Sequence, residues 1–344
     1  MNDRLRVAVL MGGTSEERNV SLSSGAQVAQ ALREAGHEVV AIDSARGLLS
    51  PADERRLRES GVHAQAPVST ELDVLRGGDT RALTRAPEVS GADVLFLALH
   101  GGAGEDGTLQ TLLDAAGLPY TGSGRVGCAL AMDKDLTKRL LRDAGIPTPD
   151  WILGAADADA VVGRLGLPVI VKPASGGSTV GLTLVKDAAD LDQATELASR
   201  SGDLPMYEQY VKGRELTVGI LGNEALPVVE IIPAHEIFDY ECKYQTGLAQ
   251  EIAPADLIPE VASQVQELAL RVHRVLRLRD FSRVDFILDA TGRAWCLEAN
   301  ALPGLTANSL LPKAALAAGI SFAALCDRIA RMAVARSALG TGAG

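Results

Sequence analysis

The order of apolar and polar residues predicts alternating strands and helices at the start of the chain. An apolar run that ends in Gly12-Gly13 is typical of a buried strand, and the spacing over 21–35 predicts an amphipathic helix. Strands are predicted over 5–11, 38–42 and 93–99. We interpret this part as a βαβ-type α/β unit. The stretch 44–90 is rich in charge, Gly and Pro, so we expect an irregular insertion there.

From about residue 123 the pattern changes to helices mixed with shorter strands. Helices are predicted over 125–145, 187–200 and 258–276, with two more near the carboxyl end. Strands are predicted near 168–172, 181–185, 205–209, 215–221 and 225–231. A Pro-bounded stretch over 233–257 lacks either periodicity and is predicted to be a long loop. Gly122 to Gly127 fits GxGxxG, but we interpret it as a turn that begins a helix, with a dinucleotide site as the weaker alternative.

Two short segments near the carboxyl end, SRVDF and CLEAN, carry the most informative polar pattern. Period-two alternation places Arg283 and Asp285 on one face of the first strand, and Glu298 and Asn300 on one face of the second. A hairpin through the DATG turn would put Arg283 opposite Glu298, with Asp285 beside them. The residues expected in the core on the other faces are Val284, Phe286, Leu288, Trp295 and Leu297. Two acids and an amide carbonyl suit a hard cation such as Mg²⁺, which usually accompanies a polyphosphate.

Composition narrows the class of protein. A chain of 344 residues, 47% hydrophobic with 35 glycines, is globular and long enough for two or three domains. A net charge of −11 without a Lys/Arg run argues against nucleic acid, although it leaves room for a nucleotide met by local lysines. There is no apolar stretch of about 18 residues, so we expect neither a signal peptide nor a membrane span. Four distant cysteines without CxxC spacing are expected to be reduced thiols in the cytoplasm.

Several polar residues at predicted strand and helix ends could bind a nucleotide. Lys172 ends a buried strand and precedes a Ser/Gly loop suited to phosphates, although the pair could also be a mobile hairpin loop and a snorkelling lysine. Lys134 begins a helix, where the dipole disfavours a cation unless an anion is near, but it could also be an exposed surface residue. Glu208, Gln209 and Glu215 could accept bonds from an adenine amine and ribose hydroxyls, or could be ordinary exposed strand-end residues.

Glu17 and His100 follow the first and third strands, so both lie at the edge of the sheet where α/β proteins bind ligands. Glu17 could pair with a substrate ammonium, but helix capping explains an acid at this position equally well. In the long predicted loop, Lys243 and Tyr244 could lie on a lid or on an ordinary solvated loop.

The segment LPGLTANSLLP follows the second strand of the hairpin. Gly304 could offer a backbone N–H, and Ser309 could be a helix N-cap or could help a helix N-terminus to bind a carboxylate.

Taken together and in this order, these segments resemble the D-alanine–D-alanine ligase family of ATP-grasp carboxylate–amine ligases, from about residue 5 to 335. The resemblance implies three domains: a Rossmann-like parallel sheet over 1–122, a central ATP-grasp lobe over 123–208 and a carboxyl-terminal lobe over 209–340, with α+β nucleotide domains that hold the nucleotide between them. It implies ATP and Mg²⁺ or Mn²⁺, ligation of two D-alanines through an acyl phosphate for peptidoglycan, and a cytoplasmic homodimer without membrane or nucleic-acid partners.

The resemblance also implies roles for individual residues. Those matching nucleotide contacts are Lys134, Lys172, Ser178, Glu208, Gln209, Val211, Glu215 and Lys243. Those matching metal ligands are Asp285, Glu298 and Asn300. Those matching the substrate and catalytic groups are Glu17, His100, Ser178, Tyr244, Arg283, Gly304 and Ser309. Within the last set, Glu17 matches the group that holds the first ammonium, Arg283 and the Gly304 amide match the oxyanion donors, and Ser309 matches the clamp on the second carboxylate. Glu17, Ser178 and Tyr244 match a set that locks a closed lid.

Three positions depart from the family pattern, and other functions stay open. Gln209 stands where lysine is frequent, Ala301 where threonine is usual and Asn19 where His or Glu is common. A ligase of the same family could instead make D-alanyl-D-lactate or D-alanyl-D-serine, although Tyr244 favours D-alanine. Another ATP-grasp ligase, or a nucleotide-binding regulator without turnover, would be a further alternative.

Overall fold

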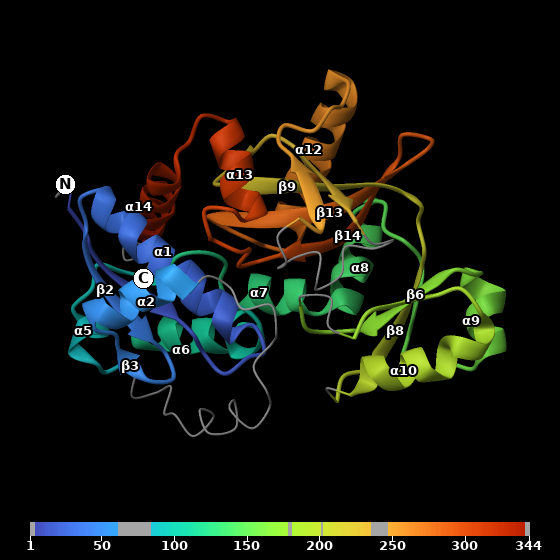
Figure 1. Ribbon diagram of the computed structural model, residues 1–344, viewed down its shortest axis with the longest axis horizontal. Coiled ribbons are helices and arrows are strands. Elements are labelled where there is room, and N and C mark those ends of the chain that lie inside the picture. Colours follow the sequence, from blue (N-terminus) through green and yellow to red (C-terminus); the bar gives the residue numbers. More distant parts are fainter. Residues whose placement is uncertain (1–3, 61–83, 178–180, 201, 235–246, 341–344) are drawn as a thin grey trace.

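The computed structural model describes residues 4–60, 84–177, 181–200, 202–234 and 247–340. Within these ranges the chain builds three separate sheets with helices packed on them (Figure 1). The amino-terminal sheet lies at one end of the molecule, the middle sheet at the other, and the carboxyl-terminal sheet above the space between them (Figure 1).

The amino-terminal sheet has the order β3-β2-β1-β4. Its strands are β1 (Arg6–Met11), β2 (Glu38–Asp43), β3 (Gly47–Leu48) and β4 (Val94–Leu97). Strand β1 pairs in parallel with β2 and β4 on its two sides, which confirms the predicted parallel unit. The carboxyl end of β1 is therefore the point at which the strand order reverses, where open α/β sheets bind ligands. Helix α1 (Arg18–Glu34) begins three residues before its predicted start and packs on β1 and β2.

The prediction of an irregular insertion over 44–90 is wrong for the described residues of that stretch. Helix α2 (Pro51–Ser60) and the short helix α5 (Pro87–Ser90) lie in it, together with β3. Pro51 opens α2, and the acids of its first turn compensate the helix dipole. Glu54 is buried and pairs with Arg33 of α1 at 2.6 Å. The high charge of this segment therefore belongs to a helix that has little apolar surface of its own.

The middle sheet is antiparallel, with the order β5-β8-β6-β7. Its strands are β5 (Trp151–Leu153), β6 (Val169–Pro173), β7 (Thr183–Val185) and β8 (Pro205–Gln209). Helices α9 (Ala158–Leu165) and α10 (Leu191–Ser199), the latter preceded by η2 (Ala188–Asp190), cover it and share its own apolar core. Strand β5 and helix α9 were not predicted. The three residues of β5, which follow two prolines, and the eight residues of α9 are patterns too short to recognise.

The carboxyl-terminal sheet has the order β12-β11-β9-β13-β14, with β10 paired to β9. Its strands are β9 (Gly213–Leu221), β10 (Glu224–Ala225), β11 (Val229–Pro233), β12 (Ala249–Ile252), β13 (Phe281–Asp289) and β14 (Ala294–Asn300). Strand β12 lies inside the predicted loop 233–257, so that prediction is wrong at residues 249–252. The remaining helices are η1 (Gly102–Gly104), α6 (Thr108–Ala116), α7 (Arg125–Met132), α8 (Lys134–Asp143), α12 (Pro259–Val275), α13 (Leu310–Ala317) and α14 (Phe322–Gly340).

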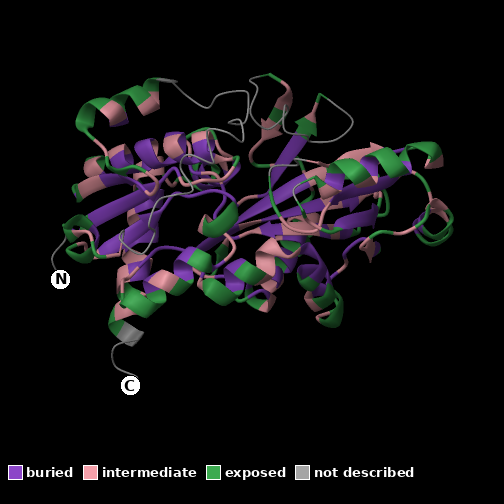
Figure 2. Ribbon diagram, turned by 90° about the horizontal axis from the view of Figure 1, so that it is seen from below, coloured by how far each residue is buried: buried purple, intermediate pink, exposed green. Residues whose placement is uncertain are grey.

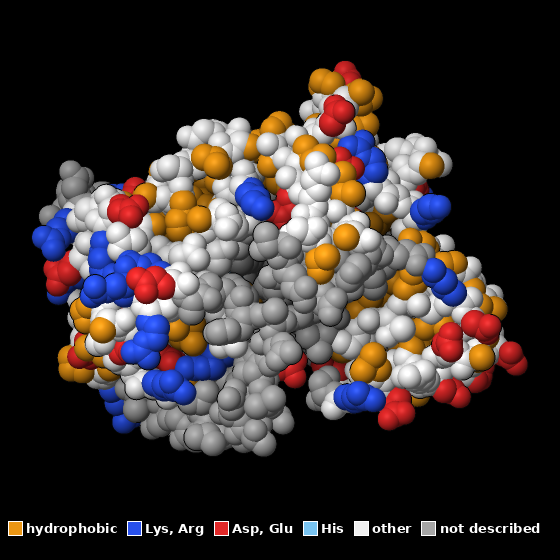
Figure 3. Space-filling view, in the orientation of Figure 1, with side chains coloured by type: hydrophobic (Ala, Val, Ile, Leu, Met, Phe, Trp, Pro, Cys, Tyr) orange, Lys and Arg blue, Asp and Glu red, His pale blue; other side chains and the backbone are white. Residues whose placement is uncertain are grey.

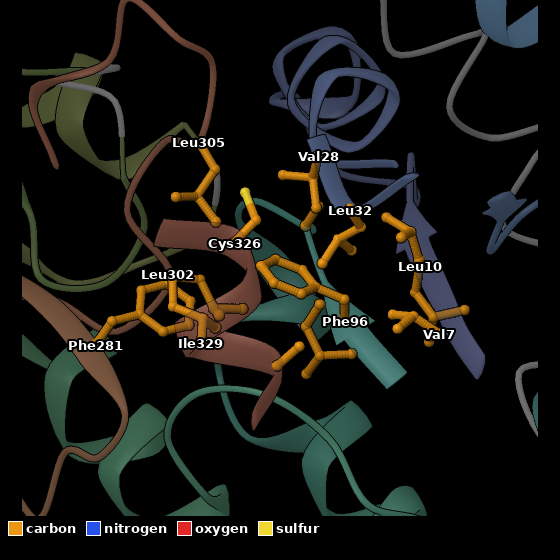
Figure 4. Packing of buried hydrophobic residues seen from close by; sticks show 14 of the residues in the cluster. Val7, Leu10, Val28, Leu32, Phe96, Phe281, Leu302, Leu305, Cys326 and Ile329 are labelled. Atoms are coloured by element: carbon orange, nitrogen blue, oxygen red, sulfur yellow. The ribbon is translucent and has the colours of Figure 1, made fainter. Parts of the chain in front are cut away.

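One apolar core joins the first and last parts of the chain. Phe96 of the amino-terminal sheet belongs to the same buried cluster as Phe281, Leu302 and Ile329 (Figure 4). The strands of the sheets carry much of the buried surface (Figure 2). The middle sheet, by contrast, has a separate cluster. The amino- and carboxyl-terminal sheets are therefore packed as one body, whereas the middle sheet is held mainly by its own core. The limits 122/123 and 208/209 stay predictions.

The hairpin forms, but its register differs from the predicted one. Asp285 lies opposite Glu298 and Arg283 opposite Asn300, two residues from the predicted register. Beside the turn the pairing is already shifted by one residue, with Phe286 opposite Cys296, and a bulge between Asp285 and Phe286 adds the second. The extra residue at the bulge is Leu297, and it lines the pocket described below instead of the core. The bulge reverses the alternation and so brings Glu298 to the face of Asp285. Trp295 and Leu297 are half-buried, so the prediction that they lie in the core is wrong, whereas Val284, Phe286 and Leu288 are buried.

Among the described residues, no single helix is both long and apolar enough to cross a membrane; α13 and α14 reach that length only together, and they are bent by 103°.

Candidate active site between the middle and carboxyl-terminal sheets

A pocket of about 510 Å³ lies between the middle and carboxyl-terminal sheets. The sequence-predicted residues that line it are Lys134, Lys172, Glu208, Gln209, Val211, Glu215, Arg283, Asp285 and Glu298. Asn300 lines a smaller cavity of about 30 Å³, which shares Lys134 and Glu298 with the first. The structure thus brings residues separated by more than 160 positions into one place.

One wall of the pocket carries a buried cluster of two lysines and one acid. Lys172 of β6 lies 2.7 Å from one oxygen of Glu208 on the neighbouring strand β8, and Lys138 of α8 lies 2.6 Å from the other. Burial alone would raise the pKa of Glu208, but the two lysines outweigh it and hold that pKa at about 2. Glu208 is therefore ionised at neutral pH. Burial lowers the pKa of Lys138, and the charge of Glu208 opposes that shift. With both lysines protonated, the cluster carries a net charge of +1. The snorkelling alternative for Lys172 is wrong, because only 6% of the residue is exposed.

Lys134 is the first residue of α8 and lies beside the loop that follows β6. Its ammonium donates to the Gly176 carbonyl at 2.6 Å, and its backbone N–H donates to the Ala174 carbonyl at 3.0 Å. The Asp133 carboxylate caps the same helix by accepting the Leu136 N–H at 2.9 Å. Lys134 is 9% exposed, so the alternative of an exposed surface lysine is wrong. It ties helix α8 to the loop that follows β6.

The opposite wall carries the polar set of the hairpin. Arg283 donates to both oxygens of Asp285 at 2.9 Å, and the Thr217 hydroxyl donates to one of them at 2.6 Å. Asn300 donates to the other at 3.0 Å, and Glu298 is the cross-strand partner of Asp285. Within the described ranges, no group of three or more His, Cys, Asp and Glu side chains is placed to share a metal ion. A metal at this wall would therefore need the amide of Asn300 beside the two carboxylates.

Apolar side chains line the pocket between the two walls. They are Ile170, Leu182, Ile231, Ile232, Ile287 and Leu297. A slot with apolar sides and charged ends fits a flat heterocycle that carries phosphates. On the face drawn in Figure 3, acidic side chains gather where the middle sheet and its helices lie. Attraction for phosphates therefore has to come from lysines inside the pocket and not from this surface.

Glu17 and His100 meet at the carboxyl end of the amino-terminal sheet. Glu17 is the N-cap residue of α1, but its side chain makes no capping bond, so the capping alternative is wrong for the side chain. The carboxylate instead lies against Gly101 and Gly177, where an added Cβ would come within 2.7 and 3.1 Å of its oxygen. Burial lowers the pKa of His100, while Glu17 opposes the shift. The ring of His100 is held by the Leu302 carbonyl at 3.1 Å and by a serine hydroxyl at 3.2 Å.

Two buried groups support this edge. Arg18 donates to the Gly13 carbonyl at 2.7 Å and forms a two-point ion pair with Asp43, which fixes the turn that carries Glu17. Glu105 accepts the Gly101 N–H at 2.7 Å, and burial followed by repulsion from Glu17 raises the pKa of Glu105 to about 8. Arg18 therefore fixes the backbone before Glu17, and Glu105 fixes the backbone at Gly101, against which the Glu17 carboxylate lies.

Gly304 and Ser309 lie close together, since an added Cβ on Gly304 would be 3.0 Å from the Ser309 hydroxyl. Ser309 is the N-cap residue of α13, yet its side chain makes no capping bond. Its hydroxyl lies 2.8 Å from that of Thr306 and accepts the Thr306 N–H at 3.2 Å. The loop before α13 is thus folded back on itself.

Three predicted site residues, Ser178, Lys243 and Tyr244, lie outside the described residues. Sequence reasoning missed Lys138 and Arg18. A signal existed for Lys138, because it follows Lys134 by four positions and so lies on the same side of the helix. A buried arginine one residue after the predicted ligand Glu17 gave no such signal.

Comparison with known proteins gives consistent results. The family model described as D-ala D-ala ligase N-terminus matches residues 6–123, and the one described as D-ala D-ala ligase C-terminus matches residues 140–331. The chain is 42% identical over 339 residues to the D-alanine–D-alanine ligase of Desulforudis audaxviator, covering 96% of this chain and 99% of that one. Its fold is similar to that of the D-alanine–D-alanine ligase from Bacillus anthracis complexed with ATP, with a TM-score of 0.77, 31% identity and coverage of 98% and 100%. It is also similar to the enzyme from Coxiella burnetii, with a TM-score of 0.78, 27% identity and coverage of 99% and 97%.

Proposed function

Because the chain belongs to the D-alanine–D-alanine ligase family, we propose that it uses ATP to join two D-alanines into D-alanyl-D-alanine, the dipeptide of peptidoglycan. The observation that carries this proposal is the pocket itself. It places the lysine–glutamate cluster on one wall and the hairpin carboxylates on the other, with apolar sides between. That arrangement suits a nucleoside triphosphate, and Glu17 lies beside its inner end.

ATP would lie with its base in the apolar slot and its phosphates toward Lys134 and Lys172. Glu208 and the backbone over 209–211 supply acceptors for the adenine amine, and Glu215 suits ribose hydroxyls. Gln209 is neutral where lysine is frequent in the family, and the buried cluster supplies positive charge in its place.

The hairpin donors fit a divalent cation. Asp285, Glu298 and Asn300 offer oxygen ligands on one face of the sheet, which is the donor set that Mg²⁺ or Mn²⁺ takes. When bound, such an ion would offset the charge of the triphosphate. Thr217 and Arg283 already orient Asp285 for that role.

The first D-alanine would be held by its ammonium at Glu17, so that its carboxylate attacks the γ-phosphate, the bond to the β–γ bridging oxygen breaks, and an acyl phosphate and ADP are formed. The amine of the second D-alanine, with its carboxylate near Ser309, would then attack that carbonyl and release phosphate. Arg283 and the Gly304 N–H would stabilise the oxyanion of this step. Chemistry of this kind depends on positioning and on fixed charges.

The test is phosphate release from ATP in the presence of D-alanine, with L-alanine as the control. We expect release that requires D-alanine, together with the dipeptide as product. No release with D-alanine, despite ATP binding, would favour a nucleotide-binding regulator. Mixed incubations with D-lactate and D-serine then separate the dipeptide ligase from relatives that make the other two products.

Arg283 gives a sharper test of the mechanism. We expect Arg283→Ala to lower kcat by about 100- to 1000-fold, the usual loss when one oxyanion donor is removed. Because Arg283 also pairs with Asp285, the metal dependence of the variant is measured alongside. Undiminished turnover in this variant would refute the oxyanion role.

Three further features belong to the proposal. A cytoplasmic location and a homodimer are inferred from the family, and cell fractionation and analytical ultracentrifugation test them. We also propose that Lys243 contacts the γ-phosphate and that Tyr244 and Ser178 join Glu17 when the site closes, as the family resemblance implies.

A further inference from the structure

Lys138 is the one member of the lysine–glutamate cluster that does not line the pocket. Its side chain is fully buried. Its ammonium donates to the Thr148 hydroxyl at 2.7 Å and to the Pro149 carbonyl at 3.0 Å, and it forms an ion pair with Glu208 at 2.6 Å. The ammonium also lies 5.3 Å from the centre of the Trp151 ring. A lysine held this firmly cannot reach a ligand in the pocket.

Burying an ammonium costs free energy unless ion pairs and hydrogen bonds compensate for the lost hydration. Lys138 contacts one carboxylate oxygen of Glu208, and Lys172, which lines the pocket, contacts the other. Without Lys138, Glu208 and Lys172 would form a neutral pair, and the carboxylate would lose one of its two anchors. With Lys138, Glu208 is fixed and the cluster keeps its net charge of +1 beside the pocket.

We propose that Lys138 is a positioning residue for nucleotide binding: it holds Glu208 in one orientation and neutralises it, so that the charge of Lys172 stays available to a phosphate. The inference rests on the proposed function only in that the ligand is ATP. Lys138 acts through Glu208 and touches neither the nucleotide nor the reacting atoms.

The experiment is a titration of the full-length protein with a fluorescent ATP analogue and Mg²⁺, without D-alanine. We expect Lys138→Met to raise the Kd roughly 10- to 100-fold, the range for a charge-assisted interaction. Arg139→Met is the matched control, because Arg139 is the next residue of the same helix and its side chain is 64% exposed. Its Kd should stay within about twofold of that of the wild type.

The double variant Lys138→Met/Glu208→Gln separates the proposed role from a merely structural one. With the lysines protonated and Glu208 ionised, the net charge of the cluster is +1 in the wild type, 0 in Lys138→Met and +1 again in the double variant. The double variant should therefore bind the analogue at least about threefold more tightly than Lys138→Met. Loss of packing alone would not be reversed by a second substitution. Equal Kd values for these two variants, or a wild-type Kd in Lys138→Met, would overturn the inference.

Thr148→Val replaces Lys138→Met if that variant does not fold. It removes one of the two hydrogen bonds that Lys138 donates without changing any charge, so the Kd should rise about threefold. An unchanged Kd in Thr148→Val would equally overturn the inference. A wild-type protein that fails to bind the analogue would instead refute the proposed function, so the two failures are distinguishable.

Discussion

Gly101 offers a direct test of whether the Glu17 carboxylate binds the first substrate. Gly101 has a φ of +67°, and a Cβ added to it would lie 2.7 Å from a Glu17 oxygen. Gly102 has a φ of +49°, but its added Cβ would meet nothing closer than Ser15 at 3.6 Å. Both variants place a side chain at positive φ, but only Gly101→Ala displaces Glu17. Gly101 also has a ψ of 167°, a region essentially restricted to glycine, so its backbone strain is the larger.

The expected magnitudes follow from these distances. An alanine at a strained backbone position costs about 1 to 3 kcal/mol, and Gly101→Ala should lose more stability than Gly102→Ala, so the rates are compared at a temperature where both variants are folded. To relieve a 2.7 Å contact, the Glu17 carboxylate has to move by roughly 0.5 Å or more, and misplacement on the order of 1 Å typically costs about 100-fold in rate. We expect kcat/KM for D-alanine to fall by about 30- to 100-fold in Gly101→Ala and by less than about threefold in Gly102→Ala.

The assay is the initial rate of phosphate release at saturating ATP with D-alanine varied, and thermal unfolding of both variants controls for stability. ATP affinity should be unchanged in both, because neither glycine lines the nucleotide pocket. The Gly101 N–H still reaches Glu105 in Gly101→Ala, so that bond is not a confounding change. If Gly101→Ala keeps the kcat/KM of Gly102→Ala, the position of Glu17 does not matter and the substrate role assigned to it is wrong.

Two further predictions concern stability and nucleotide binding. Burial lowers the pKa of His273 to about 4 from an ordinary 6.5, and its ring lies 2.7 Å from the Ser282 hydroxyl. As pH falls below 6.5 the unfolded chain takes up this proton first, so between pH 7 and 5 the free energy of unfolding should drop by about 2 kcal/mol from this group. His273→Gln should remove that part of the pH dependence in urea unfolding; an unchanged slope would contradict the assignment. Leu297→Ala should weaken ATP binding by about tenfold, for roughly 1.5 kcal/mol of lost apolar contact, and leave the KM for D-alanine unchanged; equal affinity for ATP would show that Leu297 does not contact the base.

Much of the fold could be predicted because its signals are local. The strands of the amino-terminal sheet are short continuous apolar runs, and the hairpin alternates with period two on either side of a turn. The polar residues at strand ends could be grouped for the same reason, since parallel strands end at one edge. These features depend on neighbouring residues and require no knowledge of the tertiary contacts.

The bulge at Leu297 could not be predicted in this way. A bulge adds one residue to one strand, and nothing in CLEAN distinguishes that residue from its neighbours. Its effect is large, because it decides whether Glu298 faces Asp285 or the core. The polar residues of the hairpin lie together as expected although the predicted pairing was wrong, since they were grouped by chemistry; their roles stay predictions. The same limit applies to β12, whose strand pairing to β11 depends on residues far from it in the sequence.

Lys138 illustrates why buried charged residues escape sequence reasoning. A lysine on a helix is exposed in most proteins, and its spacing of four positions from Lys134 in KDLTKRLLRD was the only local signal that it faces the site. Its main partner, Glu208, lies 70 positions away on strand β8 of the middle sheet. The free-energy cost of burying either charge is offset only when α8 packs beside β8, because the two residues then form an ion pair. The pocket residues that determine charge are therefore those whose placement depends most on tertiary packing, and their roles have to be derived from contacts and not from sequence spacing.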